Sequence, residues 1–133
     1  MALSSPMIAA AFRVSGMLAV VAIGILSLVP GHARPHVLWP GGLEHVLAYF
    51  VAASLLCLGF LHSRPTTHSD PAPGRALRIA CLLTGYGGIL EALQLFVPGR
   101  EPAMLDWGAD ALGAWLGAGL VWLLRRPVLA ALH

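Results

Sequence analysis

The stretch Ile89–Gly117, ILEALQLFVPGREPAMLDWGADALGAWLG, decides how the rest of the chain is interpreted. It consists of two apolar segments that meet at a turn containing Pro98-Gly99. Three carboxylates, Glu91, Asp106 and Asp110, lie within or at the start of those segments. Burying ionisable groups in apolar membrane segments costs free energy, so such groups usually serve a site. The stretch therefore predicts two membrane helices with a polar site between them.

The composition assigns the chain to the integral membrane proteins. Of its 133 residues, 58% are hydrophobic and only 11% are charged, whereas a soluble domain carries about 25% charged residues. The net charge of +2 comes from arginine alone, and the arginines are scattered singly rather than gathered on one face. This pattern argues against a nucleic-acid partner. The expected partner is the lipid bilayer.

Four apolar segments are near the ~20 residues that a helix needs to cross a bilayer. We predict a single all-α domain over residues 1–133, a four-helix transmembrane bundle with helices at about 14–29, 43–61, 77–97 and 106–124. Pro-Gly pairs at 30–31 and 98–99 are expected to end the first and third helices, and Pro127 is expected to follow the fourth.

The first apolar run has a second interpretation, as a secretory signal peptide. Arg13 precedes the run, and Gly31-His32-Ala33 could form a cleavage site. The run is long for a signal peptide, so a retained first helix, extended toward Met7, is preferred.

The arginines predict the orientation of the bundle. Six of the eight lie before the first helix, within or just after the 62–76 connection, or after the fourth helix, and only Arg34 and Arg100 lie in the other connections. By the positive-inside rule, both termini are cytoplasmic. Residues 62–76, rich in Pro, Ser and Thr, are then expected to form a flexible cytoplasmic loop, for which the sequence indicates no role.

Polar residues of three predicted helices fall at a similar depth. At 1.5 Å per residue, Glu91 lies about 10 Å inside the outer end of its helix, and Asp110 lies about 6 Å inside Asp106. His45 begins the second helix from the same side. Residues three or four apart share a helix face. Gln94 therefore shares a face with Glu91, and Tyr49 shares a face with His45, which adds both residues to the set. We therefore expect one polar cavity that opens to the extracytoplasmic side.

Gly113 and Gly117 form a GxxxG pair, a spacing that lets a neighbouring helix backbone approach closely. The expected neighbour is the third helix, because the connection between the two helices is short. Glycines at 85, 87 and 88 would help that approach. A homodimer face is the alternative interpretation.

Structural and functional roles are both open for the polar set. Asp106 fits a helix N-cap or first-turn position as well as a site, and the carboxylates could simply pair with Arg100. Glu91 and Asp110 lie further inside their helices, which favours a functional role for them. His45 is as readily an interfacial histidine as a site residue.

Three chemistries suit these residues. Glu91, Asp106 and Asp110 with His45 would suit general acid–base catalysis, and the same four groups would suit a divalent cation. Arg100 would suit a phosphate or carboxylate of a lipid-linked ligand. Serine and cysteine nucleophiles are not placed near the set, which argues against covalent acyl chemistry.

The motifs together resemble a known family. The resemblance is to the VanZ-like membrane proteins, spans about residues 42–124, and rests on Glu91-x-x-Gln94, Pro98-x-Arg100, Asp106-x-x-x-Asp110-x-x-Gly113 and the upstream His45-x-x-x-Tyr49. Two positions depart from the family pattern. Gly41-Gly42 stands where the family usually has Asp-Lys, and Asp110 stands where it usually has Asn. A second acid at that position favours a shared proton or a bound cation.

The resemblance implies a multi-pass protein of the bacterial inner membrane with a cell-envelope role. The family's namesake is associated with low-level resistance to the glycopeptide teicoplanin. Our leading hypothesis is a protein that binds an amphipathic, lipid-linked or glycopeptide ligand in the polar cavity. The alternatives are a small intramembrane enzyme for hydrolysis or transfer on a lipid-linked substrate, and a non-catalytic assembly protein whose polar residues join helices.

Overall fold

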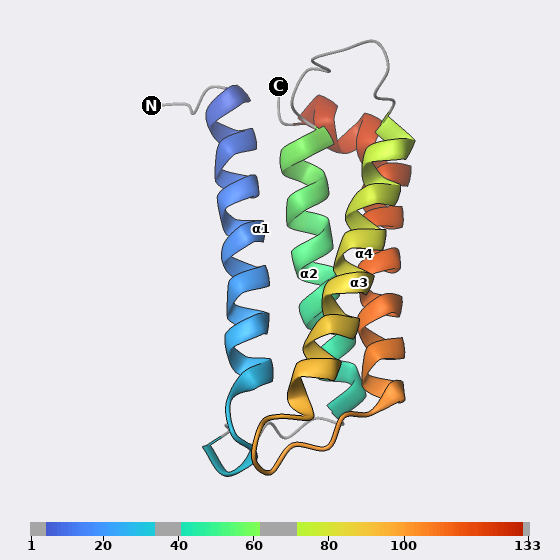
Figure 1. Ribbon diagram of the computed structural model, residues 1–133. Helices are drawn as coiled ribbons and strands as arrows, with labels where there is room; N and C mark the ends of the chain where they lie inside the picture. Colours follow the sequence, from blue (N-terminus) through green and yellow to red (C-terminus); the bar gives the residue numbers. More distant parts are fainter. Residues whose placement is uncertain (1–4, 34–40, 62–71, 132–133) are drawn as a thin grey trace.

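The computed structural model describes residues 5–33, 41–61 and 72–131 (Figure 1). The elements in these ranges are α1 (Ser5–Leu28), the 3₁₀ turn η1 (Gly31–Ala33), α2 (Gly41–Leu61), α3 (Ala72–Gln94) and α4 (Met104–Ala131). All four α-helices are long and apolar enough to cross a membrane. The prediction of an all-α, four-span membrane protein is confirmed at this level.

Several helix ends differ from the prediction. α1 begins at Ser5 rather than near 14, with Pro6 in its first turn, where a missing N–H costs nothing. α3 begins at Ala72, so residues 72–76 are helical rather than loop, and 62–71 lie outside the described residues. α4 continues past Pro127 to Ala131, because a proline removes one helical hydrogen bond and bends a helix without necessarily ending it.

The end of α3 also comes earlier than expected. The helix stops at Gln94, and the amides of residues 95, 96 and 97 bond to carbonyls three residues back, at 3.0–3.3 Å. Gly99 then turns the chain with a φ of 73°, a left-handed conformation that favours glycine. Glu91 is therefore three residues from the helix end, about 4.5 Å, rather than the 10 Å expected from Pro98.

Successive helices run in alternating directions, so the start of α1 and the end of α4 lie at one end of the bundle (Figure 1). The opposite end, here called the site end, holds the end of α1, the start of α2, the end of α3 and the start of α4. Which end faces the cytoplasm stays a prediction from the arginine counts.

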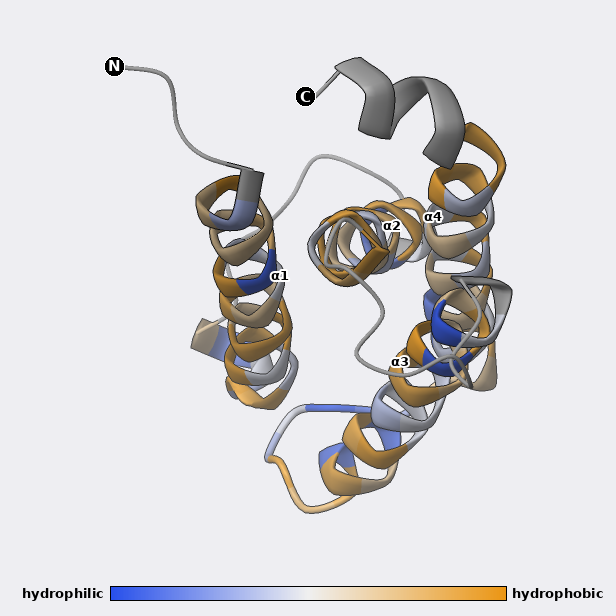
Figure 2. Ribbon diagram, turned by 90° about the horizontal axis from the view of Figure 1, so that it is seen from above, coloured by the Kyte–Doolittle hydropathy of each residue, from blue (hydrophilic) through white to orange (hydrophobic). Residues whose placement is uncertain are grey.

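α2 is the central helix and contacts all three others (Figure 2). Its packing against α4 is the most extensive, and the buried core there is built largely from small residues: Ala52, Ala53, Cys57, Ala114 and Ala118. α1 packs mainly on α2, and its other face carries large apolar side chains that are more than half exposed, such as Val14, Leu18 and Ile25. Such a face suits contact with lipid.

The GxxxG pair packs against α2, so the prediction that it meets α3 is wrong. A Cβ on Gly113 would collide with the carbonyl oxygen of Val46, and one on Gly117 with that of Phe50. Both glycines are buried in this contact, so the pair is not available as a homodimer face.

α3 meets α4 through larger side chains. The indole N–H groups of Trp107 and Trp115 donate to the carbonyl and the hydroxyl oxygen of Thr84, at 2.9 and 3.2 Å. Among the α3 glycines named above, Gly87 faces Asp110 and Gly88 faces Trp107, whereas a Cβ on the third, Gly85, would have nothing within 4 Å.

Candidate functional site

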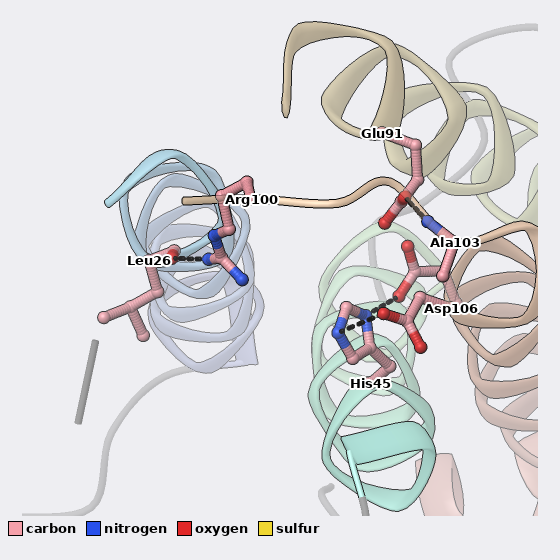
Figure 3. Close-up of polar contacts among 7 residues, drawn as sticks. Leu26, His45, Glu91, Arg100, Ala103 and Asp106 are labelled. Atoms are coloured by element: carbon pink, nitrogen blue, oxygen red, sulfur yellow. Dashed lines mark hydrogen bonds and ion pairs between the residues drawn. The ribbon is translucent and has the colours of Figure 1, made fainter. Parts of the chain in front are cut away.

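His45 lies at the centre of the polar contacts of the site end (Figure 3). Its Nδ1 lies 2.7 Å from Oδ1 of Asp110, and its Nε2 lies 3.8 Å from Oδ2 of Asp106. The two aspartates are one helical turn apart on α4 and face the same imidazole from α2. The histidine and Asp110 side chains are 12% and 3% exposed, and that of Asp106 is 35% exposed. The structure thus brings together three of the predicted site residues.

Gly87 of α3 makes room for the inner part of this cluster. A Cβ at Gly87 would lie 2.7 Å from Oδ2 of Asp110 and 3.2 Å from the hydroxyl oxygen of Tyr49. Tyr49 is only 2% exposed, and within the described ranges its hydroxyl makes no hydrogen bond of good geometry. The Asp110 carboxylate lies near this hydroxyl, on the same side of Gly87. Asp110 therefore faces both His45 and Tyr49, the predicted site residues of α2.

Glu91 has a different role from the one that its position suggested. It is 9% exposed, and its Oε2 accepts a hydrogen bond from the backbone N–H of Ala103 at 2.9 Å. Ala103 immediately precedes α4, where amides lack helical partners. The carboxylate that satisfies the start of α4 thus comes from α3. Asp106, for which a cap and a site role were both open, lies in the first turn of α4 and faces His45.

Arg100 fastens the end of α1 to the site end (Figure 3). Its Nε donates to the carbonyl of Val29 at 3.2 Å, and its Nη2 donates to that of Leu26 at 2.8 Å. The last carbonyls of a helix lack partners within the helix, so the guanidinium acts as a C-terminal cap. The N–H of Gly31 adds a bond of 3.3 Å to the carbonyl of Pro98. These contacts join residues about 70 positions apart in the sequence, so no local sequence pattern predicts them.

We expect Arg100→Met to release the end of α1 while the other three helices stay packed. The substitution keeps most of the apolar stem and removes two hydrogen bonds from a charged donor, which contribute about 1–3 kcal/mol together at this partly exposed position. Hydrogen–deuterium exchange in detergent should rise in residues 20–29 and not in α2 or α4. Arg78→Met, at the other end of the bundle, is the matched control. Unchanged exchange in residues 20–29 would show that the cap does not hold α1.

A small polar pocket of about 60 Å³ lies among α1, α2, the end of α3 and the following loop. It has room for a few water-sized groups. Its lining consists of Ile23, Leu26, Ser27, Glu44, His45, Ala48, Tyr49, Gln94 and Arg100. Four predicted site residues are among them. Glu44 was missed, although a charged residue beside His45 in the first turn of α2 is a signal that sequence reasoning could have used.

A larger groove of about 400 Å³ lies between α3 and α4 on the other side of the last turn of α3. It is lined by Gly88, Glu91, Ala92, Leu95, Pro102, Ala103, Met104 and Trp107. Glu91 is the one charged residue in this lining, which is otherwise apolar. Glu91 and Gln94 were predicted to share one cavity. They line different ones instead: Glu91 lines the groove and Gln94 lines the pocket.

The divalent-cation hypothesis gains no geometric support. Within the described ranges, no three His, Cys, Asp or Glu side chains are grouped so that they could hold a metal ion. Glu91 bonds to a backbone amide, and Asp106 and Asp110 bracket His45, an arrangement suited to hydrogen bonding and proton transfer.

Comparison with known proteins does not identify a family for the chain. No protein-family model, no curated protein and no solved structure matches the chain. The VanZ-like resemblance stays a prediction that rests on the motif spacing.

Proposed function

We propose that the protein binds the polar part of an amphipathic, lipid-linked ligand at the site end of the bundle. The observation that carries this proposal is the position of the polar pocket and the apolar groove on either side of one helical turn, Glu91–Gln94. A ligand with a polar head and a long apolar chain matches both surfaces, and a bilayer presents such molecules at high concentration.

The pocket lining offers both hydrogen-bond donors and acceptors. Gln94 and His45 can each do both, and Glu44 and Arg100 bring opposite charges to the same small space. The guanidinium already donates to the carbonyls of Leu26, in α1, and Val29, just after α1, so binding of an anionic group by Arg100 is not part of the proposal. A neutral or mixed polar head fits this lining better than a strongly anionic one.

The proposal extends to the setting of the protein. We infer a VanZ-like protein of the bacterial inner membrane, with both termini in the cytoplasm and the site end outward, that acts on the cell envelope. The motif spacing in residues 42–124 and the arginine distribution support this inference. This inference can be tested by measuring the teicoplanin tolerance of cells that express the protein.

We expect expression of the protein in a susceptible bacterium to raise its tolerance to teicoplanin, and Glu91→Gln to return the tolerance to that of the empty vector. The amide keeps the size of the side chain and can still accept from Ala103, but it removes the buried negative charge. Glu101→Gln, an exposed loop residue, is the matched control. Immunoblots of the membrane fraction must show equal accumulation of all forms. Undiminished tolerance in Glu91→Gln cells would contradict the proposal.

One observation favours an acid–base enzyme as the second candidate. Asp110 lies 2.7 Å from Nδ1 of His45, the arrangement in which a carboxylate fixes the tautomer and orientation of a catalytic histidine. With the proton held on Nδ1, Nε2 is the nitrogen that would take a proton from a water or a substrate hydroxyl. Nε2 points toward Asp106, the more exposed of the two aspartates. Hydrolysis or transfer on a lipid-linked substrate would use this geometry.

A further inference from the structure

The apolar groove between α3 and α4 stays open although the neighbouring site residues pack against one another. Two of its lining side chains, Leu95 and Met104, are 69% and 79% exposed, and Trp107 is 37% exposed. The groove therefore opens on the outer surface of the bundle, beside helices that are long and apolar enough to span a membrane. Hydrocarbon chains are the solvent at such a surface.

The groove contains a buried acidic side chain. Glu91 is part of its lining and is 9% exposed. Asp106, Asp110 and His45 lie near enough to Glu91 to act on it electrostatically. Among the described residues, three carboxylates thus share this region with the imidazole of His45. Because like charges repel strongly where water is scarce, an anionic head group would be disfavoured beside Glu91. A group that donates hydrogen bonds would be favoured.

We propose that the groove binds the hydrocarbon chain of a lipid whose head donates hydrogen bonds to Glu91, either an alcohol or an ammonium group. This inference deepens the proposed function and rests on it, because it names the chemistry of the ligand and the side of the bundle that its chain occupies. Charge complementarity selects the head, and the opening of the groove toward the bilayer selects a lipid chain over a soluble partner.

The test uses three hexadecyl probes that carry a photoreactive diazirine in the chain and end in an alcohol, an ammonium or a carboxylate. Each probe is added to the purified protein in phosphatidylcholine nanodiscs, and labelled peptides are mapped by mass spectrometry. We expect the alcohol or the ammonium probe to label residues 92–107 about tenfold more than the carboxylate probe. Labelling of the exposed face of α1 supplies the background. Equal labelling by the carboxylate probe would overturn the proposal.

Glu91→Gln separates the two head groups. An ammonium probe should lose its labelling in this variant because the negative charge is gone. An alcohol probe should lose only part of its labelling, because the amide oxygen still accepts but forms a weaker hydrogen bond than a carboxylate. Either result supports the proposal and identifies the head. If Glu91→Gln leaves the labelling by all three probes unchanged relative to α1, the head is not recognised at Glu91 and the proposal fails.

Ala92→Trp fills the groove and should abolish the specific labelling, whereas Ala22→Trp, on the exposed face of α1, should not. Both variants must elute as single species. A dimer that Ala92→Trp dissolves would assign the groove to a second copy of the chain and overturn the proposal. If Ala92→Trp keeps teicoplanin tolerance while Glu91→Gln loses it, the groove proposal fails and the proposed function stands. If neither variant changes the tolerance, the proposed function fails as well.

Discussion

Gly113→Leu is expected to prevent α4 from packing against α2 and thereby to disperse the candidate site. A Cβ at this position collides with the carbonyl oxygen of Val46, and the carbon atoms of the same residue lie 2.9 and 3.0 Å away. These are backbone atoms of a packed helix, so no rotamer change relieves the collision. Overpacking a core costs about 1–3 kcal/mol, and the rigid partner places this substitution at the upper end of that range or beyond it.

The effect should reach the site directly, because Val46 is the neighbour of His45 on α2. If the helices separate, His45 and Asp110 can no longer approach to 2.7 Å. The measurement is the yield of monodisperse protein in detergent and its midpoint of thermal unfolding, with Gly113→Ala as the smaller step. Gly108→Leu is the matched control, since a Cβ on this exposed glycine of the same helix meets nothing within 4 Å. A Gly113→Leu protein as stable as the control would refute the close approach.

This contact shows what the sequence could predict and what it could not. The lengths of the apolar segments predict four spans, because the thickness of a bilayer fixes the length of a helix that crosses it. The GxxxG spacing predicts a close helix contact but carries no information about the partner. The short connection after Pro98 favoured α3, yet the bulky indoles of Trp107 and Trp115 occupy the α3 side, and the smooth face of α4 turns to α2.

The composition of the site was more predictable than the roles of its members. Helical periodicity placed His45, Asp106 and Asp110 at one end of the bundle, and the structure brings them into contact. The roles of Glu91 and Asp106 depend on the residue at which α3 stops. The helix ends at Gln94, and Oε2 of Glu91 lies 2.9 Å from the backbone nitrogen of Ala103, just before α4. Helix ends are the least predictable feature of a sequence. The sequence therefore did not predict that Glu91 would satisfy the start of α4.

Arg100 illustrates a second limit of sequence reasoning. A lone arginine beside buried carboxylates suggests an ion pair or an anion site. The free carbonyls at the end of a distant helix compete for the same guanidinium, and here Leu26 and Val29 supply them. Their position next to Arg100 follows from the packing of α1 on α2, which no local pattern records.

Asp110→Ala is expected to destabilise the protein more than any other removal of a single polar side chain at the site end. Asp110 is 2% exposed and accepts a hydrogen bond from Nδ1 of His45 at 2.7 Å. Removing the carboxylate leaves the N–H of His45 buried and unsatisfied, at a cost of about 1–3 kcal/mol, and leaves a gap beside the buried hydroxyl of Tyr49. The unfolding midpoint should therefore fall clearly below that of Asp106→Ala, whose side chain is 35% exposed and lies 3.8 Å from the imidazole.

Asp110→Asn decides between the roles that remain open for the cluster. The amide keeps the size of the side chain and an oxygen that accepts from Nδ1 of His45, so the stability should largely return. If the cluster only joins α2 to α4, teicoplanin tolerance returns with the stability, and the assembly role is supported. If the negative charge is needed to orient a histidine that carries or transfers a proton, the tolerance stays lost in a stable protein, as it does when the charge of a catalytic carboxylate–histidine pair is removed.

A double-mutant cycle completes this test. Asp110→Asn, His45→Gln and the double variant give a coupling free energy for stability, which is about 0.5–3 kcal/mol for residues in direct contact. A coupling near zero would show that the 2.7 Å contact contributes nothing to the fold. Because both substitutions keep a polar side chain of similar size, a stable double variant without tolerance would assign the pair to the chemistry of the site rather than to its architecture.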